Sequence, residues 1–300
     1  MDARDFNLEA PKVEGGKFLE KIYDLQMELI NEYTGIERIP SPPINVNTKS
    51  SQILFKDFIG RVVEELSEGY ESLELVHDLA QKNNLWQGAK YSIPDLSQAM
   101  NHLQNAGEEM ADALHFMAEL LIYANILPED ISSYLDHLVQ ITDDMPISDL
   151  RDNVIAKAMI WGGRVIPEYT NGTTHKLDLV ELYRELIQEA DSDNLNVSPL
   201  SEEVLYSCGR RYNSSDTQSL YKKMLWDVTH HLNIARNFLK NKPWKQSQMM
   251  TNEEAFQESL VRGFIAMMGL FYAMGLDYNS IYILYFRKNL TNRFRIRSKY

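Results

Sequence analysis

The amino-acid sequence predicts an all-α protein built from a duplicated helical-bundle unit. Apolar residues recur at helical spacing in most of the long segments, and we find no convincing strand pattern. The two halves of the chain also share an apolar skeleton, because EEMADALHFMAELLIYANIL in the first half aligns with QESLVRGFIAMMGLFYAMGL in the second. We therefore expect two related helical units in one chain.

The same patterns divide the chain into four parts. Residues 1–16 form a loose polar arm, 17–140 a first helical half, 141–176 a linker or long loop, and 177–300 a second helical half. Proline is expected to keep residues 35–50 in a loop. Apolar spacing predicts helices at residues 17–33, 55–75, 101–123, 131–141, 149–161, 177–190, 202–211, 220–239, 253–274 and 280–295.

Composition limits the classes of protein that the chain can belong to. The 300 residues are 44% hydrophobic and carry a formal net charge of −13, so general affinity for nucleic acid or anionic lipid is not expected. A single cysteine, Cys208, excludes an internal disulfide and suits a reducing compartment. The polar N-terminus is not a signal peptide, and the longest apolar run, residues 264–276, is too short to span a bilayer. We expect a cytoplasmic protein that does not enter a membrane.

Two of the predicted helices carry pairs of carboxylates three residues apart, which places each pair on one helix face. Glu109 and Asp112 lie in a helix that is apolar on most faces, and Glu65 and Glu68 flank the apolar stripe of residues 55–75. Buried carboxylates require partners, and Mg²⁺ or Mn²⁺ is a partner that uses several carboxylate oxygens at once. The alternative is that these are ordinary surface acids, as most Glu and Asp residues are.

The second half keeps the apolar skeleton but loses most of the acids. Glu258 aligns with Glu109, whereas Val261 aligns with Asp112, and Asp227, His230 and His231 stand where the first acidic pair would be needed. Adjacent histidines point about 100° apart on a helix and cannot chelate a metal from one face. The second copy is therefore predicted to be degenerate in its metal-binding acids.

The C-terminal stretch is strongly basic. From Arg287 onward it carries six Lys and Arg residues and no acid. Tyr285, Lys288, Asn292 and Arg295 share one helix face, and such a strip of cations and amides suits a polyphosphate. A solvated basic tail, or one that binds nucleic acid, is the alternative interpretation.

Three motifs together resemble the all-α nucleoside triphosphate pyrophosphatases, which include MazG-like enzymes, dimeric dUTPases and phage dCTPase/dUTPases. They are EExxE at residues 64–68, EExxDxLHF at 108–116 and YxxKNxxNxxR at 285–295. The last motif points to the dUTPase/dCTPase branch. The resemblance covers about two-thirds of the chain and leaves residues 141–176 and 191–219 unexplained.

The resemblance implies roles for individual residues. It assigns Mg²⁺, with Mn²⁺ as an alternative, to Glu65, Glu68, Glu109 and Asp112, with Glu68 orienting or deprotonating the attacking water. It assigns the phosphates to Lys288, Asn289, Asn292 and Arg295. Leu25-Gln26 matches a base-reading Leu-Gln motif, which implies that Gln26 contacts the base, and Asn31 stands one residue away from the expected position of a second base contact.

The expected activity is therefore Mg²⁺-dependent hydrolysis of a deoxypyrimidine triphosphate, dUTP or dCTP, to monophosphate and pyrophosphate, in the control of nucleotide pools. The resemblance favours a homodimer over a monomer, and nucleic acid is not an expected partner. Two alternatives remain: a MazG-like enzyme with broad base preference, and a helical binding module without enzymatic activity.

Overall fold

The computed structural model describes residues 13, 17–37, 39–82, 93–131, 215–242, 244–246, 248–274, 276 and 278–298. The linker at 141–176, the helices predicted at 149–161, 177–190 and 202–211, most of the helix at 131–141, and Cys208 lie outside these residues. Of the N-terminal arm, Val13 is described, and its side chain is buried.

Every regular element within the described residues is a helix, which confirms the all-α prediction. None of these helices is long and apolar enough to cross a membrane. In chain order the elements are α1 (Phe18–Glu37), α2 (Lys49–Lys82), α3 (Ile93–Tyr123), α8 (Ser215–Phe238), α9 (Glu253–Ala273) and α10 (Tyr278–Ser298).

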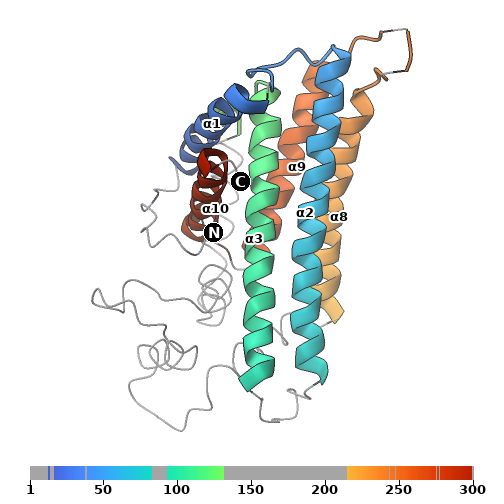
Figure 1. The fold of residues 1–300 in the computed structure, drawn as a ribbon. Coiled ribbons are helices and arrows are strands. Elements are labelled where there is room, and N and C mark those ends of the chain that lie inside the picture. The colour runs from blue at the N-terminus through green and yellow to red at the C-terminus, as the bar shows by residue number, and fades with distance from the viewer. Residues whose placement is uncertain are drawn as a thin grey trace.

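The helices form a bundle with a smaller pair of helices on one side. The helix α2 packs along α3 and α8 packs along α9, while α2 also contacts α8 and α3 contacts α9 (Figure 1). The helices α1 and α10 pack on each other and against α3. One apolar core runs through all of them: Phe55 of α2 meets Phe256 of α9 edge to face, with ring centroids 5.1 Å apart.

Several helices are longer than their apolar stripes predicted. The helix α2 begins at Lys49 because the Thr48 hydroxyl accepts a hydrogen bond from the Ser51 backbone N–H at 3.1 Å, which caps the helix. The helix α3 begins at Ile93 and places Pro94 in its first turn, where proline is tolerated. The helix α1 continues through Gly35 to Glu37, so the predicted loop begins later than expected.

The helix α3, which packs on α2, and the helix α9, which packs on α8, have the same type of C-terminal hydrogen bond. Ile126 N–H donates to the Leu121 carbonyl and Leu276 N–H donates to the Phe271 carbonyl, each at 3.0 Å, which is the six-to-one bond that closes helix C-termini. Aligning α3 and α9 by this bond shifts the sequence alignment by one residue, and Asp112 then pairs with Arg262. The duplication itself stays a prediction.

Candidate metal and phosphate site

Three of the four predicted metal ligands meet where α2 passes α3. Glu65, Glu109 and Asp112 each offer a carboxylate oxygen, and these oxygens lie within 4.8 Å of one another. All three residues are partly buried. We call this group the carboxylate cluster. Glu68 is exposed and outside the cluster, although its negative charge helps to raise the pKa of both Glu65 and Glu109.

A glycine explains why the two helices approach so closely at this point. A Cβ atom added to Gly69 would lie 2.9 Å from Met110 Cε, 3.4 Å from Glu109 Cβ and 3.5 Å from the Ala106 carbonyl oxygen. A side chain at this position would push against α3 beside the cluster. Gly69 therefore helps to bring the acid of α2 to the acids of α3.

The cluster holds more negative charge than its surroundings neutralise. Burial, the charge of Asp112 and a hydrogen bond with Glu109 raise the pKa of Glu65 from 4.5 to about 8. Burial raises the pKa of Glu109 as well, and the hydrogen bond from Glu65 partly offsets this rise. A proton shared between two carboxylates is a substitute for a cation, so the donor set fits a hard divalent metal ion.

A lysine of the predicted phosphate strip reaches the cluster from α10. Lys288 Nζ lies 2.5 Å from Asp112 Oδ2, and the two side chains are only 13% and 19% exposed. The ammonium group neutralises one of the three carboxylates, and once the shared proton has left, the remaining charge of about −2 would balance one divalent cation. Lys288 is thus placed beside any phosphate that a metal ion in the cluster would bind.

The other predicted phosphate ligands lie in different surroundings. Asn289 is fully buried and donates from Nδ2 to the Leu25 carbonyl of α1 at 3.2 Å, while its Oδ1 has no hydrogen-bond partner within the described residues. Asn292 is partly buried, and Arg295 is exposed. Of the four residues, Lys288 is therefore the one that the described structure brings into contact with the carboxylate cluster.

The predicted base contact Gln26 lies in a buried polar group next to the cluster. Its Oε1 accepts a hydrogen bond from the Tyr285 hydroxyl, and its Nε2 has no hydrogen-bond partner in the part of the chain described. The Tyr285 ring stacks on His115 of α3, with centroids 4.0 Å apart and planes 11° apart. Asn31, the second predicted base contact, is exposed and does not join this group.

His115 completes this group as a neutral imidazole. Burial lowers the pKa of His115 to about 4, and its Nδ1 donates to the Ala111 carbonyl at 2.8 Å. Its Nε2 consequently carries a lone pair, which has no hydrogen-bond partner among the described residues. A buried donor on Gln26 and buried acceptors on His115 and Asn289 are thus available close to the cluster.

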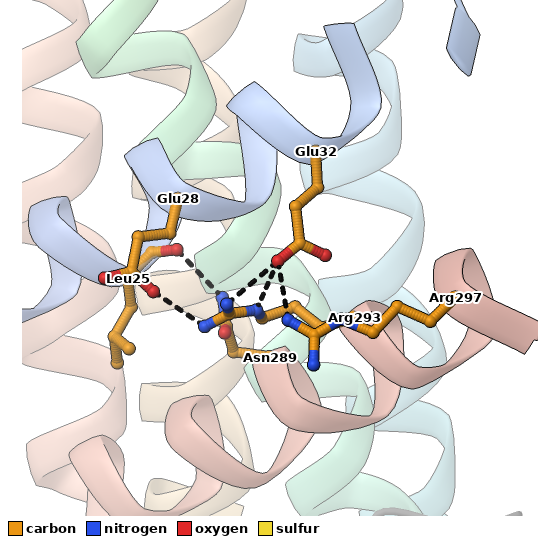
Figure 2. A network of polar contacts seen from close by, with 6 residues as sticks. All are labelled: Leu25, Glu28, Glu32, Asn289, Arg293 and Arg297. Carbon is orange, nitrogen blue, oxygen red and sulfur yellow. Dashed lines mark hydrogen bonds and ion pairs between the residues drawn. The ribbon is translucent and has the colours of Figure 1, made fainter. Parts of the chain in front are cut away.

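Ion pairs between α1 and α10 hold the basic helix in place, and the sequence analysis missed them. Figure 2 shows Arg293 between Glu28 and Glu32, at 2.6 Å and 2.8 Å, with Arg297 also 2.9 Å from Glu32. Burial favours a raised pKa for Glu32, but hydrogen bonds from Arg297 and Arg293 lower it. The signal was present, because each helix carries its pair four residues apart on one face.

Comparisons of the chain with protein-family models, curated proteins and solved structures gave no match.

Proposed function

We propose that the chain is a Mg²⁺-dependent nucleoside triphosphate pyrophosphohydrolase that acts on a deoxypyrimidine substrate, dUTP or dCTP. The contact of Lys288 with Asp112 is the observation that carries the proposal, because it joins a predicted phosphate ligand on α10 to a predicted metal ligand on α3. Carboxylates alone are common on protein surfaces, whereas a nearly buried ammonium paired with one carboxylate of a cluster of three suits a metal-bound polyphosphate.

The residues of the cluster fit the proposed metal. Glu65, Glu109 and Asp112 would hold Mg²⁺ through hard carboxylate oxygens, and such an ion would offset the burial and the neighbouring negative charge that raise the pKa of Glu65. When bound, Mg²⁺ supplies Lewis acidity at phosphate and lowers the pKa of the attacking water. Mn²⁺ would satisfy the same ligands.

In the proposed reaction water attacks the α-phosphorus, the bond to the bridging oxygen breaks, and pyrophosphate leaves. Glu68 is exposed next to the cluster and accepts the proton of the attacking water. Lys288 neutralises charge on the phosphate oxygens. Gln26 presents its free amide donor to a carbonyl or ring nitrogen of the base. A homodimer in the cytoplasm, acting to control nucleotide pools, belongs to the same proposal.

A panel of deoxynucleoside triphosphates incubated with the full chain and Mg²⁺ tests the proposal, with products resolved as mono- and diphosphates. Monophosphate and pyrophosphate from dUTP or dCTP alone is the expected result. Turnover of every triphosphate would replace the substrate assignment with a broad, MazG-like one. If no triphosphate is hydrolysed with either Mg²⁺ or Mn²⁺, the enzymatic proposal is wrong and a binding module becomes the better interpretation.

The chain offers a matched pair of variants for this assay. Glu109→Gln removes a carboxylate of the cluster and is expected to abolish turnover, as is Asp112→Asn. Glu258→Gln is the control: the sequence alignment pairs Glu258 with Glu109, and Glu258 is an exposed acid of α9 that bonds Arg262 at 2.7 Å, so its replacement should leave turnover unchanged. If the Glu109 and Glu258 variants were equally active, Glu109 would not be a ligand of the proposed metal ion.

A further inference from the structure

The loop that joins α8 to α9 exposes large apolar side chains in a basic setting. We call residues 239–252 the α8–α9 loop; in Figure 1 it projects beyond the end of the bundle. Trp244 is 74% exposed, Met249 56% and Met250 79%. No acid occurs from residue 228 to residue 252, a stretch that carries Arg236, Lys240, Lys242 and Lys245.

Hydrogen bonds hold the backbone of the α8–α9 loop in place. Asn241 is buried, and its side chain bonds Met249 twice: Nδ2 donates to the Met249 carbonyl at 2.9 Å and Oδ1 accepts from Met249 N–H at 2.6 Å. These bonds close the loop on itself. Within it, Lys245 N–H donates to the Lys242 carbonyl at 3.1 Å and forms the turn that carries Trp244.

A buried amide fastens the loop to the start of α2. Gln52 accepts from Asn241 N–H at 2.7 Å and donates from Nε2 to Thr251 Oγ1 at 2.9 Å. Asn47 Oδ1 accepts from Thr251 N–H at 2.7 Å. Because the backbone is fixed before any partner arrives, docking through this loop loses little conformational entropy.

Cations from α2 add to the charge of the loop. Lys49 donates to the Lys245 carbonyl, and Lys56 has its pKa lowered by burial and by the charges of Arg236 and Lys242. Two exposed acids, Glu253 and Glu254, follow the loop at the start of α9, so six cations stand against two carboxylates. Salt screens the interaction between exposed charges over about 8 Å at physiological ionic strength, so acids further than that from the loop weaken its positive charge only slightly.

We propose that the α8–α9 loop docks the protein on an anionic lipid surface. The loop projects from the bundle, which suits a flat surface. Trp favours the headgroup level of a bilayer, and methionine side chains are apolar enough to enter the acyl boundary. Lysines around them pair with lipid phosphates and carboxylates, and each adds affinity near an anionic surface. The negative net charge argues against general anion affinity, so the proposal is confined to this locally basic loop.

Nucleic acid fits the same surface less well. Single strands are held by a positively charged groove with several aromatic platforms for successive bases. The loop offers one exposed ring, and Lys242 Nζ covers that ring at 5.3 Å from the centroid of Trp244. Met249 and Met250 provide apolar surface but no ring on which a base can stack.

Sedimentation with vesicles tests the proposal on the purified full chain. We expect binding to an equal mixture of phosphatidylcholine and phosphatidylserine, weakened by salt, and little binding to phosphatidylcholine alone. Replacing Trp244, Met249 and Met250 together by serine should lower the affinity at least tenfold, roughly the effect of exposing one large apolar side chain. Trp226→Ser is the matched control, because Trp226 is 64% exposed on α8 outside the loop and its loss should change nothing.

A second variant separates charge from apolar contact. Lys242→Gln with Lys245→Gln should weaken binding by about tenfold or more and reduce its salt dependence. Lys223→Gln, an exposed lysine of α8, serves as its control. Circular dichroism confirms that each variant is folded. Failure to bind phosphatidylserine vesicles, equal binding by the loop variants, or binding of a single-stranded oligonucleotide in place of vesicles would each overturn the proposal.

Discussion

Glu65→Gln is expected to stabilise the metal-free protein at high pH. A carboxyl group whose pKa is higher in the folded chain binds its proton more tightly there, so stability falls as pH rises from about 4.5 and levels off above about 8. The full shift would correspond to about 5 kcal/mol. Because Glu65 is partly exposed and screened by solvent, we expect about 1–2 kcal/mol.

Thermal unfolding at about pH 5 and about pH 9, with and without Mg²⁺, measures this effect. Without metal, Glu65→Gln should gain about 2–4 °C over the wild type near pH 9 and almost nothing near pH 5. With Mg²⁺ at 100 times its dissociation constant, the wild type should gain about 2.7 kcal/mol and the variant much less. Glu71→Gln, an exposed acid of α2 outside the cluster, is the control.

The reasoning would be refuted if the wild type and Glu65→Gln had the same dependence of stability on pH. It would also fail if Mg²⁺ stabilised both proteins equally, because the ion would then bind elsewhere. A variant that is more stable without metal and less stabilised by it is the combination that a metal-binding carboxylate predicts.

Three further predictions concern the scaffold. Arg293→Ala removes the ion pairs with α1 and should lower the free energy of unfolding in urea by about 1 kcal/mol, less at high salt, whereas Arg262→Ala should change it little. Phe256→Ala removes a fully buried ring from the contact between α2 and α9 and should cost about 3–5 kcal/mol by the same measurement. Asn241→Ala removes the bonds that close the α8–α9 loop and should cost about 1–3 kcal/mol. Limited proteolysis should then cut that loop faster.

The helices and the acidic pairs were predictable because both depend on local spacing. The stripe at residues 55–75 placed both Glu65 and Glu68 at its flank, of which the structure brings Glu65 to the cluster and leaves Glu68 exposed, and the apolar surround of Glu109 and Asp112 indicated an enclosed position. The exact starts of α2 and α3 were not predictable from that signal. The start of α2 depends on a cap at Thr48 and on a polar first turn that carries no apolar stripe, and the start of α3 depends on a proline that the first turn of a helix tolerates.

The position of α10 was less predictable because it depends on residues far away in the chain. Its basic residues looked alike in sequence, yet Arg293 and Arg297 bind acids of α1 while Lys288 binds Asp112. The matching four-residue spacings made a pairing between α1 and α10 possible, but that these helices pack on each other, and that Lys288 meets Asp112, follows from how α10 lies between α1 and α3.

The two ends of the predicted phosphate strip consequently have different roles. Lys288 is nearly buried beside the carboxylate cluster, whereas Arg295 is exposed and lies about 10 Å further along the helix axis. If the proposed metal ion binds in the cluster, Lys288 would lie nearer than Arg295 to a phosphate on that ion. The helix face that Tyr285, Lys288, Asn292 and Arg295 share did not show which of them reaches the cluster, and the binding of phosphate by this strip stays a prediction.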